Sequence, residues 1–193
     1  MNHEQISIRR LSPDLLDDFL AFFDDEAFAD NPKWGSCYCQ FLYVDHSKVD
    51  WKARTASENR GAACGGISAS RMQGFLAYRS GRVVGWCNAA PRDMMDAFAD
   101  EPDAESNQIG EITCFVAAKP HRRSGVATAL LEAAYEGLKA YRLRRRSHRK
   151  TPPPRRRTTT ARSACTWRQV SKFTAETAEQ FSCAAALRSS TAL

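Results

Sequence analysis

The sequence has no long hydrophobic run: no uninterrupted apolar stretch approaches the roughly 20 residues that a membrane-spanning helix needs. Residues 1–10 carry charges and lack the apolar block of a secretory signal. With 43% hydrophobic and 26% charged residues, the composition is typical of a soluble globular protein. We therefore expect a cytoplasmic protein with no membrane partner.

The sequence also lacks the regular cysteine spacing of a disulfide-rich domain. Its seven cysteines are an odd number at irregular intervals, in a chain long enough to fold without disulfides, so we expect reduced thiols. Cys37-x-Cys39, together with Cys64 and His46, is the only group that suggests zinc. This spacing is not a standard finger pairing, and no metal site is predicted.

Acidic residues are missing from residues 137–175, a stretch that contains ten arginines. Residues 1–140 hold 15 basic and 20 acidic residues, a net charge of −5, whereas residues 141–193 hold 13 and 2, a net charge of +11. Only three residues of 141–163 are apolar, too few to offset the entropy lost on ordering a chain. We therefore predict a folded domain over 1–140 and a basic, low-complexity tail over 141–193 that is disordered.

Residues 1–140 show regular strand and helix patterns. Strands are predicted over 6–10, 73–79, 82–90 and 109–117, and helices over 13–24, 51–60 and 124–140. Ser80-Gly81 predicts a two-residue hairpin turn, whereas Gly65 and Gly66 are interpreted as a break after a helix. In the last strand, Ile112, Cys114 and Val116 are expected to face one way.

The junction between the last strand and the last helix carries the clearest chemical signal. Arg122-Arg123-Ser124-Gly125-Val126-Ala127 places a basic turn with one glycine directly before a helix. The first N–H groups of a helix have no partner inside it, its dipole attracts anions, and Gly125 permits close approach to the backbone. By itself the pattern is equally compatible with a phosphate site and with a plain turn that carries solvated arginines.

The block Gly110–Leu131 resembles the acetyl-CoA-binding motif of the GNAT N-acetyltransferases, whose core is Arg/Gln-x-x-Gly-x-Gly/Ala. Arg122, Gly125 and Ala127 occupy these three positions. The predicted order of strands and helices over residues 5–140 is similar to that family as well. The resemblance implies an α/β (α+β) fold with a mixed, mostly antiparallel twisted sheet flanked by helices, whose C-terminal part is replaced by the basic tail.

The resemblance also implies a reaction, the transfer of an acetyl group from acetyl-CoA to a primary amine of a small molecule or peptide. Glu111 is the candidate general base, because members of the family often place a glutamate on this strand. The alternative is a strand glutamate in solvent. The implied cofactor-binding residues are Phe115, Val116 and Ala117 beside the pantetheine arm, and Arg122, Arg123, Ser124, Gly125, Val126 and Ala127 around the pyrophosphate.

An aromatic stretch lies where the resemblance places the acceptor site. We expect its members to pack against the sheet more than to line an amine pocket. They are Trp34, Tyr38, Phe41, Tyr43 and Trp51.

The last third of the chain departs from the family. It has no Tyr-x-x-x-Gly-Phe segment, whose tyrosine often protonates the departing CoA thiolate, and the last tyrosine is Tyr141. Codons chosen for residues 157–174 permit a neighbouring reading frame that contains such a segment. We hypothesise a frame shift near Ala140, which would remove a sheet edge and part of the acceptor site and puts activity in question.

A second hypothesis treats the arginine-rich tail as an arm that binds nucleic acid non-specifically through its phosphates. No basic-aromatic recognition motif accompanies the arginines. Acetyl transfer is therefore the preferred prediction, and nucleic acid is not the expected partner.

Overall fold

The structure, a computed structural model, describes residues 5–99 and 109–148. Four strands form one sheet in the order β1-β2-β3-β4, and every pairing in it is antiparallel. The strands and helices are β1 (Ser7–Arg10), α1 (Leu16–Ala21), α2 (Ala56–Ser68), β2 (Gly74–Arg79), β3 (Arg82–Pro91), β4 (Gly110–Ala117) and α3 (Val126–His148). The predicted α/β class, with an antiparallel sheet flanked by helices, is confirmed. The predicted replacement of the C-terminal part by a basic tail concerns residues outside the described ranges, apart from the end of α3.

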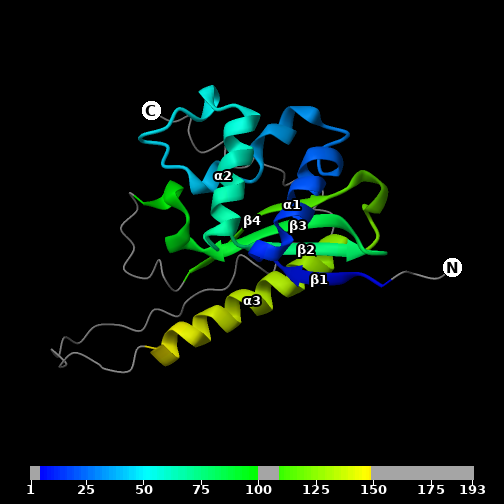
Figure 1. Ribbon diagram of the computed structural model, residues 1–193. Coiled ribbons are helices and arrows are strands. Elements are labelled where there is room, and N and C mark those ends of the chain that lie inside the picture. The colour runs from blue at the N-terminus through cyan, green and yellow to red at the C-terminus, as the bar shows by residue number, and fades with distance from the viewer. Residues whose placement is uncertain (1–4, 100–108, 149–193) are drawn as a thin grey trace.

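Helices cover both faces of the sheet: α1 and α2 lie on one face, and α3 crosses the other (Figure 1). The core under α1 and α2 is aromatic, because Phe19 stacks on Phe23 with ring centroids 4.4 Å apart and meets the edge of Trp86 at 5.0 Å. The core under α3 is mostly aliphatic and includes Val126 and Leu130. The sheet is therefore buried on both faces. Among the described residues, no helix is long and apolar enough to cross a membrane.

Side-chain capping determines where α2 begins. The Thr55 hydroxyl accepts a hydrogen bond from the Glu58 amide, and the Glu58 carboxylate accepts one from the Thr55 amide, which is a capping box. The helix begins at Ala56, later than the predicted start at Trp51. It continues through Gly65 and Gly66, so the predicted helix break at these glycines is wrong. A Cβ on Gly66 would lie 3.4 Å from the Cβ of Met72, so a glycine here permits close packing.

The other predicted elements are confirmed with small shifts. Ser80 and Gly81 have positive φ angles of 51° and 76°, as a two-residue hairpin turn requires. α3 begins at Val126 and continues to His148, past the predicted end at Ala140. Arginine is a good helix former, and basic residues are favourable near the carboxyl end of a helix, so the local sequence supports this extension.

Gly85→Ala tests the contact between α3 and β3. A Cβ at Gly85 would lie 2.6 Å from Cγ1 of Val126, 3.1 Å from the carbonyl oxygen of Val116 and 3.2 Å from Cδ1 of Leu130. We expect the substitution to lower the free energy of unfolding by about 1–3 kcal/mol, measured by urea denaturation. The control is Gly61→Ala in α2, where no atom lies within 4 Å, and it should raise stability by about 0.5–1 kcal/mol. An unchanged stability of Gly85→Ala would contradict this packing.

Candidate functional site

A bulge in β4 sets which side chains reach each face of the sheet. Asn88 of β3 pairs with Cys114 and Ala89 pairs with Ile112, so Thr113 is an extra residue on β4. Ile112 packs in the core under α3, whereas Cys114 and Val116 pack under α1 and α2. The expectation that these three side chains share a face is wrong, because the extra residue reverses their alternation.

Glu111 lies at the start of β4, opposite Ala90. Since its neighbour Ile112 faces α3, alternation directs Glu111 to the face that α1 and α2 cover. Its Oε1 is 3.5 Å from Nη1 of Arg92, and the two side chains are only 26% and 19% exposed. The Arg92 guanidinium also lies over the ring of Phe98, 4.3 Å from its centroid. Glu111 is therefore a half-buried carboxylate beside a cation, and not a strand glutamate in solvent.

The turn between β4 and α3 has the backbone shape of an anion-binding concavity. Arg123 and Gly125 have positive φ angles of 58° and 86°, and the Ser124 hydroxyl donates to the His121 carbonyl oxygen. Alternating hands of backbone conformation turn successive N–H groups toward one side, where an anion binds. The nearest atom to a Cβ built on Gly125 is Cδ1 of Ile6 at 3.9 Å, so the glycine backbone is approachable.

The Arg122 side chain holds this turn in place. Its Nη1 and Nη2 donate to the two carboxylate oxygens of Asp30 at 2.6 and 2.9 Å, and its Nε donates to the Ala117 carbonyl oxygen at 3.1 Å. These hydrogen bonds lower the pKa of Asp30, and the charge of Arg122 adds to the effect. No sequence pattern indicated Asp30, which lies 92 residues from its partner. Arg79 supports the turn as well, donating from Nη2 to the Ser124 carbonyl oxygen at 3.3 Å.

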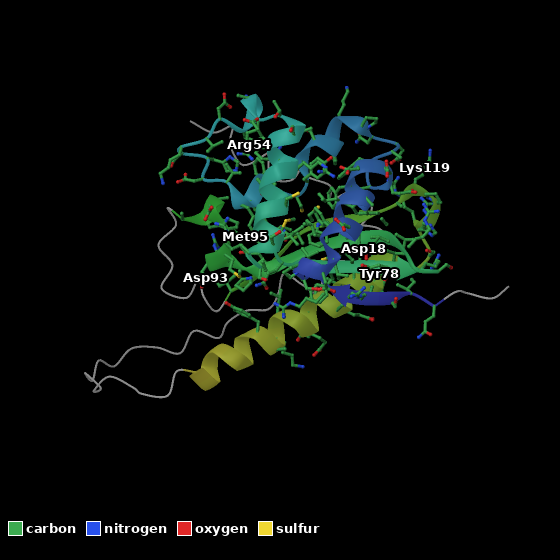
Figure 2. All side chains as sticks on the ribbon, viewed as in Figure 1. Asp18, Arg54, Tyr78, Asp93, Met95 and Lys119 are labelled. Carbon is green, nitrogen blue, oxygen red and sulfur yellow. The ribbon has the colours of Figure 1, made fainter. Side chains whose placement is uncertain are left out.

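The two chemical features lie at opposite ends of β4. Lys119 begins the turn that follows β4. Asp93 and Met95 follow β3, close to the end of that strand that pairs with Glu111. In Figure 2, Lys119 lies far from Asp93 and Met95. Six residue steps separate Glu111 from Ala117, which at the rise of a strand is about 20 Å. Within 5–99 and 109–148, β4 is an edge strand whose outer side pairs with no other strand. An extended ligand can therefore lie along this edge between the carboxylate and the turn.

The aromatic stretch serves mostly to pack the layer of helices and turns. Tyr38 is buried, and Tyr43 packs against the aromatic core. Phe41 and Trp51 are half-buried and meet edge to face, with ring centroids 5.1 Å apart. Cys39, part of the group that suggested zinc, accepts a hydrogen bond from Nε1 of Trp86 at 3.2 Å. No group of three metal-ligating side chains occurs within the described ranges.

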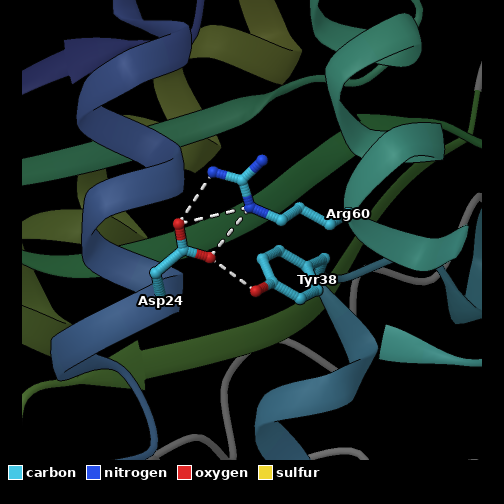
Figure 3. A network of polar contacts seen from close by, with 3 residues as sticks. All are labelled: Asp24, Tyr38 and Arg60. Carbon is cyan, nitrogen blue, oxygen red and sulfur yellow. Dashed lines mark hydrogen bonds and ion pairs between the residues drawn. The ribbon is translucent and has the colours of Figure 1, made fainter. Parts of the chain in front are cut away.

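An ion-pair network joins the turn of Tyr38 to α2 and to the helical turn Phe22–Glu26 that follows α1 (Figure 3). The Arg60 guanidinium donates to both oxygens of Asp24 at 2.8 to 3.2 Å, and the Tyr38 hydroxyl donates to the same carboxylate at 2.5 Å. The hydrogen bonds from Arg60 lower the pKa of Asp24, and burial beside Asp24 raises the pKa of Tyr38 to about 12. Tyr38 has a positive φ of 44°, so the network holds a residue in a conformation that it rarely adopts.

Comparison with known families decides the class of protein. A sequence profile described as the Acetyltransferase (GNAT) family matches residues 15–152. The chain belongs to this family. The GNAT fold and an acyltransferase activity, both expected from the sequence, are therefore confirmed at the level of the family.

Two solved structures are similar to this GNAT protein. One is the acetyltransferase of the GNAT family from Streptococcus pneumoniae, with 20% identity and a TM-score of 0.41 over 71% of this chain and 68% of that one. The other is an N-acetyltransferase from Staphylococcus aureus Mu50, with 18% identity and a TM-score of 0.42 over 70% and 67%. A search of curated proteins finds no match.

Asp24→Asn tests the network around Tyr38. The folded-state pKa of Asp24 is lowered, so its ionised form stabilises the fold above the unfolded value of about 4. This stabilisation is lost as pH falls through the folded-state pKa. We expect Asp24→Asn to lower the free energy of unfolding by about 1 kcal/mol at pH 7 and by less at pH 3, measured by urea denaturation.

Tyr38→Phe is the matched control, because it removes one hydrogen bond and keeps the Asp24 carboxylate paired with Arg60. Its loss should be smaller than that of Asp24→Asn at pH 7 and should also shrink at pH 3, because the Tyr38 hydrogen bond likewise lowers the pKa of Asp24. An equal loss for Asp24→Asn at pH 7 and pH 3 would contradict the role of the ion pair.

Proposed function

We propose that the protein transfers an acetyl group from acetyl-CoA to a primary amine of a small molecule or peptide. The observation that carries this proposal is the arrangement of β4, which has a half-buried carboxylate at one end and an anion-binding type of turn at the other. Membership in the GNAT family supports the acyl-transfer chemistry.

For the acetyl-CoA site, we propose that the backbone amides of residues 123–127 bind the pyrophosphate. These amides belong to the turn and to the first turn of α3, where N–H groups have no partner within the helix. Gly125 permits the close approach, and Arg122 acts through its bonds to Asp30 and Ala117 by holding the turn. The backbone of Phe115, Val116 and Ala117 offers the edge on which the pantetheine arm pairs as an added strand.

Glu111 is the proposed general base. An amine must be uncharged to attack the thioester carbonyl carbon, so a proton has to leave the nitrogen. The carboxylate of Glu111 accepts this proton, directly or through one water, while Arg92 and the sheet restrict its orientation. The C–N bond forms, the C–S bond breaks, and CoA leaves as the thiolate.

All residues of the proposed site lie within 1–140, the segment that we propose as the acetyl-CoA-binding domain. The helix α3 and the family match continue past this boundary, to residues 148 and 152. Residues 149–193 fall outside the described part of the chain. The disordered tail, the frame shift and the nucleic-acid arm are hypotheses that concern mainly those residues.

Gly125→Ala tests the acetyl-CoA site. A Cβ strains a residue at φ of 86° and narrows the approach to the backbone, so we expect the Kd for acetyl-CoA to rise about tenfold. Isothermal titration calorimetry on the full chain measures it. Gly61→Ala, an exposed glycine in α2, is the matched control and should leave the Kd unchanged. Failure of the wild-type chain to bind acetyl-CoA would contradict the proposed function.

Glu111→Gln tests the proposed base. The amide keeps the size of the side chain and cannot accept the amine proton, so kcat should fall by a factor of about 10²–10⁴ while the KM for acetyl-CoA changes little. A thiol-release assay with a panel of primary amines measures both. Glu132→Gln on the exposed side of α3 is the control and should retain wild-type kcat. A Glu111→Gln variant with wild-type kcat would assign the base elsewhere.

A further inference from the structure

A chain of hydrogen bonds leads from the loop before β2 to the bulge of β4. The Gln73 amide donates to the Tyr43 hydroxyl at 3.3 Å, and that hydroxyl donates to Oδ1 of Asn88 at 2.9 Å. Nδ2 of Asn88 donates to Oγ1 of Thr113 at 3.0 Å. Asn88 is only 1% exposed, so water does not compete for its amide. Gln73, Tyr43 and Asn88, which come from three separate segments, are thus linked in series to the hydroxyl group of Thr113.

The chain has a defined direction. Burial raises the pKa of the Tyr43 phenol well above its usual range, so the phenol stays protonated and donates to Asn88. This donation makes Oδ1 the acceptor atom of Asn88, and its NH₂ group then points at Thr113. The Thr113 oxygen is occupied as an acceptor, and its O–H is left to donate. Within the part of the chain that the structure describes, no acceptor for that O–H is found.

Alternation along β4 places this hydroxyl on the same face as the proposed base. Thr113 contacts Asn88 on the face that α1 and α2 cover, and Glu111 lies on the same face two residues earlier. Two steps along a strand bring these side chains within about 7 Å of one another. In a regular strand, the same alternation would turn Cys114 toward α3. The bulge instead keeps Thr113 and Cys114 on one side.

We propose that the Thr113 hydroxyl donates a hydrogen bond to the carbonyl oxygen of the thioester, and that Asn88 and Tyr43 are positioning residues that orient it. This inference rests on the proposed function. When the amine nitrogen attacks, the C–N bond forms and the carbonyl electron pair moves to oxygen, where the Thr113 donor stabilises the negative charge. The pair returns as the C–S bond breaks. Thr113 keeps its proton throughout; the amine proton goes to Glu111, and the thiolate is protonated by water.

Isotope-edited infrared spectroscopy tests the contact without any turnover. Acetyl-CoA labelled with ¹³C at the carbonyl carbon is bound to the full chain, and its C=O stretch is compared with that of the free ligand. We expect a shift to lower frequency with the wild type and with Thr113→Ser, which keeps the hydroxyl. Thr113→Val, which keeps the shape and loses the hydroxyl, should reduce this shift. An equal shift with Thr113→Val would overturn the proposal.

Steady-state kinetics give a second readout. Thr113→Val should lower kcat by about 100-fold, the loss typical for one donor to an oxyanion, with the KM for acetyl-CoA changed less than about threefold. Thr113→Ser should recover most of kcat, and Tyr43→Phe should lower kcat although it retains the Thr113 hydroxyl. Wild-type kcat in Thr113→Val would overturn the proposal. Failure of the wild type to bind acetyl-CoA would instead overturn the proposed function itself. The experiments therefore distinguish a failure of the proposed function from a failure of the proposed role of Thr113.

Discussion

Pairing between β3 and β4 slips by one residue at Thr113, and the direction of every side chain on either side of it depends on that slip. Before the bulge, Ile112 packs under α3 and Glu111 turns toward α1 and α2. After it, Cys114 and Val116 complete the aromatic core. A single inserted residue therefore decides which side chains of β4 enter each hydrophobic core, and it places Thr113 and Cys114 on the same face.

Both cores are needed to hold this strand, because β4 lies at the edge of the described sheet and is bonded to β3 alone. The helix α3 crosses β3 at Gly85, where the absence of a side chain lets Val126 approach the sheet closely. The start of α3, and with it the turn before it, is positioned by this contact. The anion-binding type of turn is thus a consequence of packing as well as of its own backbone conformation.

Local signals in the sequence predicted much of this architecture. Hydrophobic periodicity located the four strands, Ser80-Gly81 located the hairpin, and the glycine before α3 located the turn. The errors arose where local patterns depended on contacts with distant residues. Gly65 and Gly66 lie within α2 and do not end it, and Gly66 packs closely against Met72. The alternation of β4 fails at a bulge that no residue type predicts.

The sequence by itself determined the fold class and the family, because the order of strands and helices and the Arg122-x-x-Gly125-x-Ala127 turn are local features that residue type and hydrophobic periodicity reveal. Only the tertiary structure decided the partners of the site: Arg92 for Glu111, Asp30 for Arg122, and Asn88 for Thr113. Periodicity reports which way a residue faces within its own element. It does not tell which distant side chain will form an ion pair or a hydrogen bond with that residue. In this protein these partners lie 19 to 92 residues away along the chain.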